Sequence, residues 1–237
     1  MVGKVVEPTE WLQARKALLQ KEKDLTRASD ALAKERQELP MVRVTKEYTF
    51  EGPSGSRVSL ADLFDGRDQL IVYHYMFAPE DTKGCGGCRF MGEHMPTDFY
   101  LRQRNTSLAV ISRAPKEKLD AFRRDMGWSF PWYSSGGSDF NYDLHVTLDA
   151  DKAPVTYNYM TAEELEAKGK KFHISGDQPG WSVFLKRDGE IFHTYSAFAR
   201  GGDKFLGTLQ LLDLTPLGRQ DDSAGPEGFK MRGDDEE

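Results

Sequence analysis

Cysteine is scarce in this chain: two residues, Cys85 and Cys88, occur among 237. One pair cannot build the multi-disulfide framework that holds small secreted domains together. Histidine is scarce as well, with five residues, and no second CxxC occurs, so a structural zinc site would lack the two further ligands that it needs. The pair therefore favours dithiol redox chemistry, with half of a zinc site and two inert buried thiols as the alternatives.

Long apolar runs and basic stretches are also missing. No run approaches the ~18 apolar residues that span a bilayer, and the N-terminus lacks the charged-then-apolar pattern of a secretory signal. After Gly218, seven acidic residues stand against three basic ones, a net charge of −4 that leaves −2 of the total −6 for the rest. Nucleic-acid binding would need a basic face. We expect a cytoplasmic protein that binds neither nucleic acid nor membrane, and in that compartment a CxxC is more often catalytic than structural.

The two cysteines follow a β-rich apolar run, residues 70–77, across a polar loop, and lead into a segment that can form a helix. Strand, loop, CxxC and helix in this order are typical of thioredoxin-like proteins. At the start of a helix, Cys85 would meet unpaired backbone N–H groups and the positive end of the helix dipole, which favour the thiolate. The charges of Lys83 and Arg89 act in the same direction. Cys88, one turn further on, can then attack a mixed disulfide.

Residues 9–39 predict one long helix, with Thr9 as its N-cap and Pro40 at its end. Between Glu10 and Glu38, seven basic and six acidic residues indicate solvated faces. Large apolar residues recur every seven positions with two leucines beside them, and we call this set the apolar stripe: Trp11, Leu18, Leu25, Leu32, Leu39, Leu12 and Leu19. So narrow a stripe can pack on the domain or on a second copy of the helix. An intramolecular clamp and a homodimerisation arm are therefore both consistent with the sequence.

The rest of the chain predicts a β-α-β-α-β-β-α order. A strand over 107–112 and a helix over 115–127 follow the CxxC helix, and a β-hairpin over 181–195 and a helix over 203–212 complete it. Parallel strands place ligand-binding loops at their carboxyl ends, where the cysteines lie. The predicted fold is a thioredoxin-like three-layer α/β/α domain with a central mixed sheet. Its expected parts are a helical arm at 1–40, the domain at 41–218 with an insertion at 139–179, and a disordered acidic tail at 219–237.

Three stretches carry a resemblance to a known family: "WLQARKALLQKEKDLTR", "GWSFPWYSSGGSDFNYD" and "FHTYSAFARGGDKFLGTLQLLDLTPLGR". They resemble a bacterial domain-of-unknown-function family described as predicted dithiol-disulfide oxidoreductases, over about residues 5–219. The resemblance implies the thioredoxin-like fold and a dithiol-disulfide activity. The shorter stretches "VSLADLFDG", "ISRAP" and "FPW" are more distantly similar to peroxiredoxin-like and thiol-disulfide reductase chains.

Two features differ from those relatives. Peroxiredoxins carry PxxxTxxC at the peroxide-reactive cysteine, whereas Pro79, Thr82 and Cys85 form PxxTxxC, one residue short. Thioredoxins place a cis-proline before the third central strand, where this chain is expected to have Gly180 or Trp181, with Pro179 slightly early.

The first hypothesis is a thiol-disulfide oxidoreductase in which Cys85 is the nucleophile and Cys88 resolves the mixed disulfide. It would need no cofactor and no metal, act on protein or small-molecule disulfides, and take electrons from an external reductant. The tryptophans Trp128, Trp132 and Trp181 are candidates for a substrate-binding wall, although such rings can equally pad the core. The alternatives are a thiol peroxidase that uses the same pair and a non-catalytic thioredoxin-fold binding module. Copper delivery is disfavoured, because the thioredoxin-fold copper chaperones space their cysteines as CxxxC.

Overall fold

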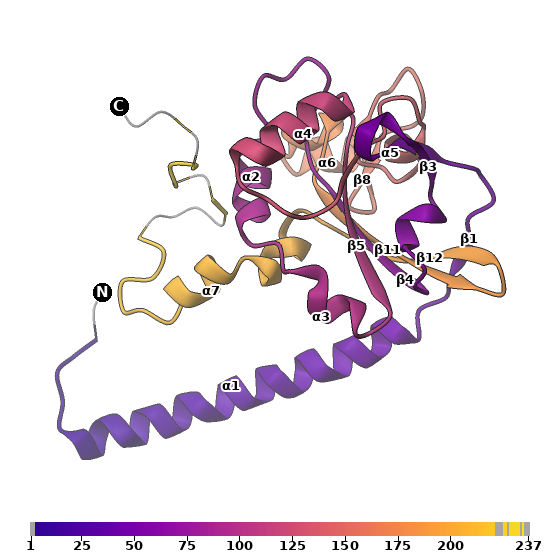
Figure 1. Ribbon diagram of the computed structural model, residues 1–237. Helices are drawn as coiled ribbons and strands as arrows, with labels where there is room; N and C mark the ends of the chain where they lie inside the picture. The colour runs from indigo at the N-terminus through magenta and orange to yellow at the C-terminus, as the bar shows by residue number, and fades with distance from the viewer. Residues whose placement is uncertain (1–2, 221–224, 227, 233, 235–237) are drawn as a thin grey trace.

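The computed structural model describes residues 3–220, 225–226, 228–232 and 234. Within them, a mixed sheet of eight strands forms the centre, in the order β1-β12-β11-β4-β5-β6-β2-β3 (Figure 1). Strands β4, β5 and β6 run parallel, and β11 runs antiparallel to both β4 and β12. The strands are β1 (Val42–Arg43), β2 (Thr49–Glu51), β3 (Arg57–Ser59), β4 (Gln69–His74), β5 (Thr106–Ser112), β6 (Trp132–Ser134), β11 (Gly180–Arg187) and β12 (Glu190–Phe198). The predicted thioredoxin-like order of elements is confirmed.

Helices cover the sheet face from which Tyr73 projects. They are α2 (Gly86–Glu93), α3 (Asp98–Arg102), α4 (Lys116–Asp125) and α7 (Gly207–Leu212). The chain between α2 and α3 contains Pro96, as the sequence predicted, and α4 is followed by Gly127 at a φ of 67°. Both faces of the central strands are covered, since every residue of β5 is buried. This explains the uninterrupted apolar run at 108–111.

Successive residues of β4 alternate between two apolar clusters. Tyr73 belongs to the cluster under the helices, which also contains Cys88, Trp132 and Trp181. Val72 belongs to the cluster on the opposite face. The period of two along a strand therefore decides which side chains of β4 reach the cysteines.

The predicted insertion forms a small subdomain beside β12. Its elements are α5 (Phe140–Asp143), β7 (Thr147–Leu148), β8 (Thr156–Tyr157), β9 (Met160–Thr161), α6 (Ala162–Ala167) and β10 (Gly176–Asp177). Thr161 and Glu164 form a capping box at the start of α6, where the sequence predicted a helix. Tyr157 and Leu165 pack with Phe198 of β12, which ties the insertion to the sheet. Short 3-10 turns are η1 (Pro53–Gly55), η2 (Asp62–Phe64), η3 (Lys171–Ile174) and η4 (Ala199–Phe205).

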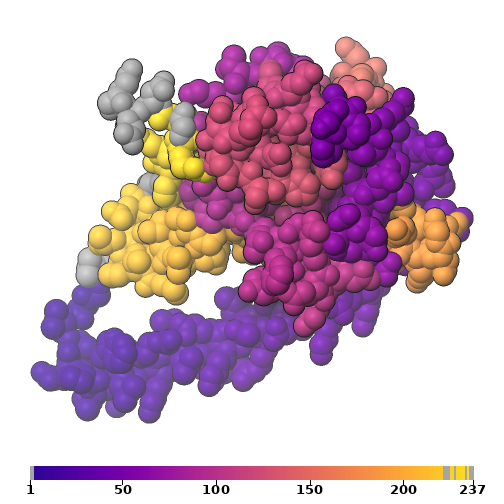
Figure 2. Space-filling model, in the orientation of Figure 1, coloured from indigo at the N-terminus to yellow at the C-terminus, as the bar shows by residue number. Residues whose placement is uncertain are grey.

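The N-terminal helix α1 spans Pro8–Gln37 and confirms the predicted single helix. Its N-cap is Glu7 rather than Thr9, because Pro8 occupies the first turn, where its missing N–H costs nothing. No residue of α1 is buried, and the apolar stripe is 38–73% exposed. Figures 1 and 2 show α1 along the underside of the domain, with open space above its N-terminal half. The stripe therefore does not clamp the helix onto the described part of the domain, and the dimerisation arm stays a prediction.

The last described residues lie against the domain. We call Gly225, Pro226, Gly228–Arg232 and Asp234 the C-terminal segment. Its Phe229 ring lies 5.1 Å from that of Phe90, and Asp234 pairs with Arg89 at 2.7 Å between Oδ1 and Nη1. The sequence placed residues 219–237 in a disordered tail, judged by net charge, which hid these apolar and ionic contacts. Residues 221–224, 227, 233 and 235–237 lie outside the described residues. Among the described residues, no helix is long and apolar enough to cross a membrane.

Candidate redox site

Cys85 stands at the N-terminus of α2, where the sequence placed it. It is the N-cap residue, and its carbonyl accepts the first intrahelical hydrogen bond from the Arg89 N–H at 2.8 Å. Its own N–H donates to the Met76 carbonyl at 3.2 Å, which fixes the loop against the chain that follows β4. The cysteine is therefore held by backbone bonds on both sides.

The Cys85 thiol is partly exposed, and its pKa is lowered from 9.0 to about 6. The Cys88 thiol, which donates a hydrogen bond to it, is the largest cause. The backbone N–H groups of Gly87 and Cys88 and the Arg89 charge act in the same direction, against partial burial, which raises the pKa. At neutral pH this sulfur is mostly thiolate, the form that attacks disulfides.

Cys88 has the opposite environment. It is 1% exposed, and burial is the first cause that raises its pKa well above that of an ordinary thiol, followed by the hydrogen bond and charge of Cys85. Two donors favour its thiolate: Tyr73 Oη at 3.2 Å from Sγ, and the Met76 N–H at 3.4 Å. The sequence analysis missed both donors. The signal that could have found Tyr73 is the two-residue period of β4, which aims it at the helix face.

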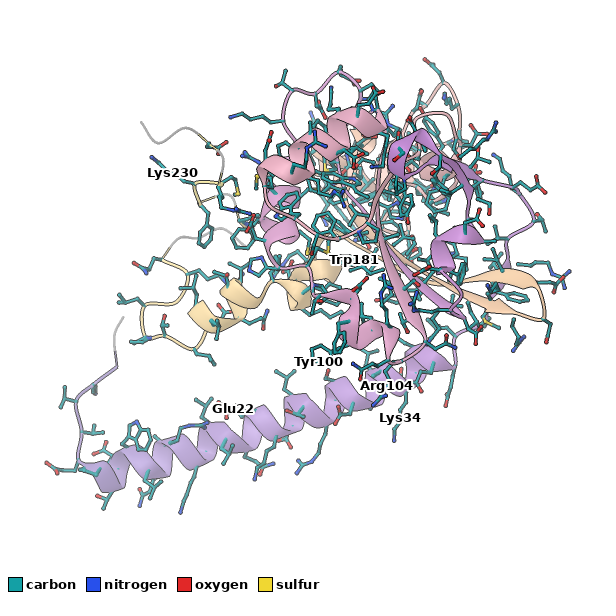
Figure 3. The ribbon with its side chains drawn as sticks, in the orientation of Figure 1. Glu22, Lys34, Tyr100, Arg104, Trp181 and Lys230 are labelled. Atoms are coloured by element: carbon teal, nitrogen blue, oxygen red, sulfur yellow. The ribbon has the colours of Figure 1, made fainter. Side chains whose placement is uncertain are left out.

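A pocket of about 710 Å³ opens beside Cys85. Its walls come from α2, from the start of β11, from η3 and from the stretch around α7. The residues that the argument uses are Met91, Phe172, Trp181, Leu206, Pro226 and Met231. Trp181 is the member of the predicted tryptophan wall that lies here (Figure 3). The lining is mostly apolar, as expected for a surface that accepts part of a polypeptide or a small organic molecule.

The other two tryptophans lie elsewhere. Trp132 is 2% exposed, and its Nε1–H donates to Ser112 Oγ at 3.0 Å, so it is a core residue. Trp128 donates from Nε1 to Glu93 Oε1 at 3.0 Å and lines a separate hollow of about 340 Å³. The structure therefore does not bring either ring to the pocket beside Cys85. The aromatic segment pads the core, which was the alternative reading of the same residues.

The other residues singled out by the sequence lie as follows. Thr82 is exposed and is not part of the pocket lining. Pro179 lines the pocket just before β11, and the peptide bonds of the described residues are all trans. His74 is buried and shares a hydrogen bond of 2.9 Å with Ser182 Oγ, and burial lowers its pKa to about 3. Within the described ranges, no group of three or more histidines, cysteines and acidic residues could hold a metal ion.

Comparison with known proteins gave one family and several structural likenesses. The family described as "Bacterial protein of unknown function (DUF899)" matches residues 2–235. No curated protein matches the chain. Among solved structures, the chain is similar to peroxiredoxin Q of Xanthomonas campestris, with a TM-score of 0.47, 14% identity, and coverage of 73% of this chain and 97% of that one. It is similar to the peroxidoxin BcpB of Mycobacterium tuberculosis, with a TM-score of 0.46 and the same identity and coverage.

Proposed function

Since the chain belongs to the DUF899 family of bacterial proteins, whose description leaves the activity open, we propose a function from its own site: a thiol-disulfide oxidoreductase. The observation that carries the proposal is the asymmetry of the two sulfurs. Cys85 is partly exposed at a helix N-terminus with a pKa of about 6, whereas Cys88 is buried and bonded to Tyr73. A nucleophile and a resolving thiol need this difference.

In the first step, the Cys85 thiolate attacks one sulfur of a substrate disulfide. The substrate S–S bond breaks, a Cys85–substrate disulfide forms, and the other substrate sulfur leaves as a thiolate that takes a proton from solvent. The N–H groups at the start of α2 stabilise the Cys85 anion before attack. Since the attacking sulfur has a pKa near ambient pH, it combines a high thiolate fraction with adequate nucleophilicity.

In the second step, Cys88 loses its proton and attacks Cys85 Sγ. The mixed disulfide breaks, the second substrate sulfur leaves as a thiol, and a Cys85–Cys88 disulfide remains. Two electrons have then passed to the substrate, and an external dithiol must supply two to restore the pair. Formation of the mixed disulfide removes the Cys85 charge, which is one cause of the raised Cys88 pKa. Tyr73 and the Met76 N–H can then stabilise the Cys88 thiolate.

Single-cysteine variants test the assignment. Cys88→Ser should accumulate a mixed disulfide with its substrate, because no thiol remains to resolve it, and Cys85→Ser should trap nothing. Mass spectrometry of each variant after incubation with a disulfide-bonded protein such as insulin reads the outcome. Trapping by Cys85→Ser instead would reverse the roles of the two thiols.

A peroxide assay separates this proposal from a thiol peroxidase. In a peroxidase, Cys85 would be oxidised to sulfenic acid and Cys88 would condense with it to release water. The exposed position of Thr82 outside the pocket gives that reading no support. Reduction of insulin disulfides without consumption of hydrogen peroxide supports the oxidoreductase. Peroxide turnover without insulin reduction would replace it with the peroxidase, and neither activity would favour a binding module.

A further inference from the structure

The C-terminal segment lies across α2 beside the nucleophilic sulfur. A Cβ built on Gly86 would lie 3.7 Å from Met231 Cγ, and one built on Gly87 would lie 3.7 Å from Pro226 Cγ. Pro226 and Met231 also line the pocket that opens at Cys85. The two glycines between the cysteines therefore leave room for a chain to approach the start of α2 closely. The chain that approaches here is the protein's own C-terminal segment.

Ionic contacts hold the segment at both ends of α2. The Arg89 side chain is only 10% exposed and donates two hydrogen bonds to the Asp234 carboxylate, at 2.7 and 3.2 Å. Lys83 lies 3.6 Å from the same carboxylate. Arg232 pairs with Glu93 at 2.6 Å and donates to the Met126 carbonyl. A bidentate arginine–carboxylate pair with one buried partner is the strong and directional kind of ion pair.

Apolar contacts alternate with these charges. Phe229 packs on Phe90, and both Phe229 and Met231 pack against the main cluster under the helices. Lys230, between them, is exposed and points outward (Figure 3). Inward apolar residues separated by an outward polar one are the pattern by which extended peptides are recognised. The contacts run from Gly87 to Glu93, along the whole of α2, which is more than a small disulfide could occupy.

We propose that the surface along α2 beside Cys85 is a polypeptide-binding groove, and that the C-terminal segment is its resident occupant. This rests on the proposed function and names its substrate class: protein disulfides within extended segments that offer apolar side chains and a carboxylate for Arg89. A substrate binds by displacing the segment. Because a tethered occupant acts at a high effective concentration, often in the millimolar range, it weakens the apparent affinity of every competitor.

Removal of residues 225–237 tests the occupancy without any turnover. The rate constant for alkylation of reduced Cys85 is measured with iodoacetamide and with a bulky polyethylene-glycol maleimide. Truncation should raise the maleimide rate about tenfold or more, as expected if the segment is seated at least nine-tenths of the time, and the iodoacetamide rate less. Phe229→Ala and Asp234→Asn should each give part of this increase. Lys230→Ala, with its exposed side chain, is the matched control and should behave as the full chain.

A synthetic peptide of residues 225–234, added to the truncated protein, tests recognition. It should restore protection of Cys85 from the maleimide and change the fluorescence of the truncated protein, because Trp181 lines the groove. A peptide that carries Phe229→Ser, Met231→Ser and Asp234→Asn should do neither. Equal maleimide rates with and without the segment, or equal protection by both peptides, would overturn the proposal. Neither readout needs a catalytic cycle, so a failure of the oxidoreductase function would leave these results interpretable.

Discussion

Replacement of Tyr73 by phenylalanine should slow the resolving step and leave the first attack unchanged. Tyr73 Oη donates to Cys88 Sγ at 3.2 Å inside the core, with no printed contact to Cys85. Hydrogen bonds to a charged partner contribute about 1.5–3 kcal/mol. Loss of that stabilisation from the Cys88 thiolate predicts a resolving step about 10- to 150-fold slower, at 1.4 kcal/mol for each factor of ten.

The reaction of the reduced protein with 5,5′-dithiobis(2-nitrobenzoate) separates the two steps by stopped-flow absorbance. Attack by Cys85 releases the first coloured thiolate, and attack by Cys88 on the mixed disulfide releases the second. Tyr73→Phe should slow only the second phase. An unchanged second phase, or two phases slowed equally, would refute the role given to Tyr73.

Tyr75 provides the matched control two residues along. Its ring lies 6.2 Å from that of Tyr73, but its buried hydroxyl has no hydrogen-bond partner among the described residues. Tyr75→Phe should keep both phases at their normal rates. It should also leave unfolding in urea unchanged or shift it to higher denaturant, because a buried unpaired hydroxyl costs about 1–3 kcal/mol.

Further predictions concern pH, packing and association. The alkylation rate of Cys85 should titrate with a midpoint near pH 6, against a midpoint near 9 if the helix start does not stabilise the thiolate. Because this pKa is lowered on folding, the thiolate stabilises the reduced protein fully above pH 9 and the effect is lost as pH falls through 6; urea unfolding of reduced and oxidised protein should show the difference, and parallel pH profiles would argue against it. Gly84→Ala should destabilise by about 1–3 kcal/mol, since its Cβ would lie 2.4 Å from Tyr75 Oη, whereas Gly86→Ala meets ordinary contact distances and should be milder; equal midpoints in urea would contradict this. Light scattering should find a dimer for the full chain and a folded monomer after deletion of residues 1–38, because the apolar stripe is exposed and α1 buries nothing; a monomeric full chain would rule out the dimerisation arm.

The sequence predicted the elements whose signals are local. The CxxC after an apolar run placed Cys85 at a helix N-terminus, and Pro115 and Gly127 bracketed a helix that α4 confirms. The cap of α1 was displaced by two residues, because Pro8 is as good a first-turn residue as Thr9 is a cap. Boundaries of this kind depend on competition between neighbouring residues, which pattern alone does not rank.

The parts that escaped the sequence depend on contacts between distant residues. Tyr73 and Cys88 are 15 positions apart, and Arg89 and Asp234 are 145 apart. Nothing local distinguishes Trp181, which lines the pocket, from Trp132, which is buried in the core. Net charge described the chain end as an acidic tail, whereas two apolar residues and one carboxylate within it decide where its described part lies.

Titration of the protein in mixtures of reduced and oxidised glutathione, with a thiol count by mass spectrometry, tests the central claim most directly. The account predicts that Cys85 and Cys88 exchange together between two free thiols and one intramolecular disulfide, with no third state at equilibrium. A protein that keeps both thiols across the whole range of mixtures, or that stops at a glutathione adduct on Cys85, would contradict the account.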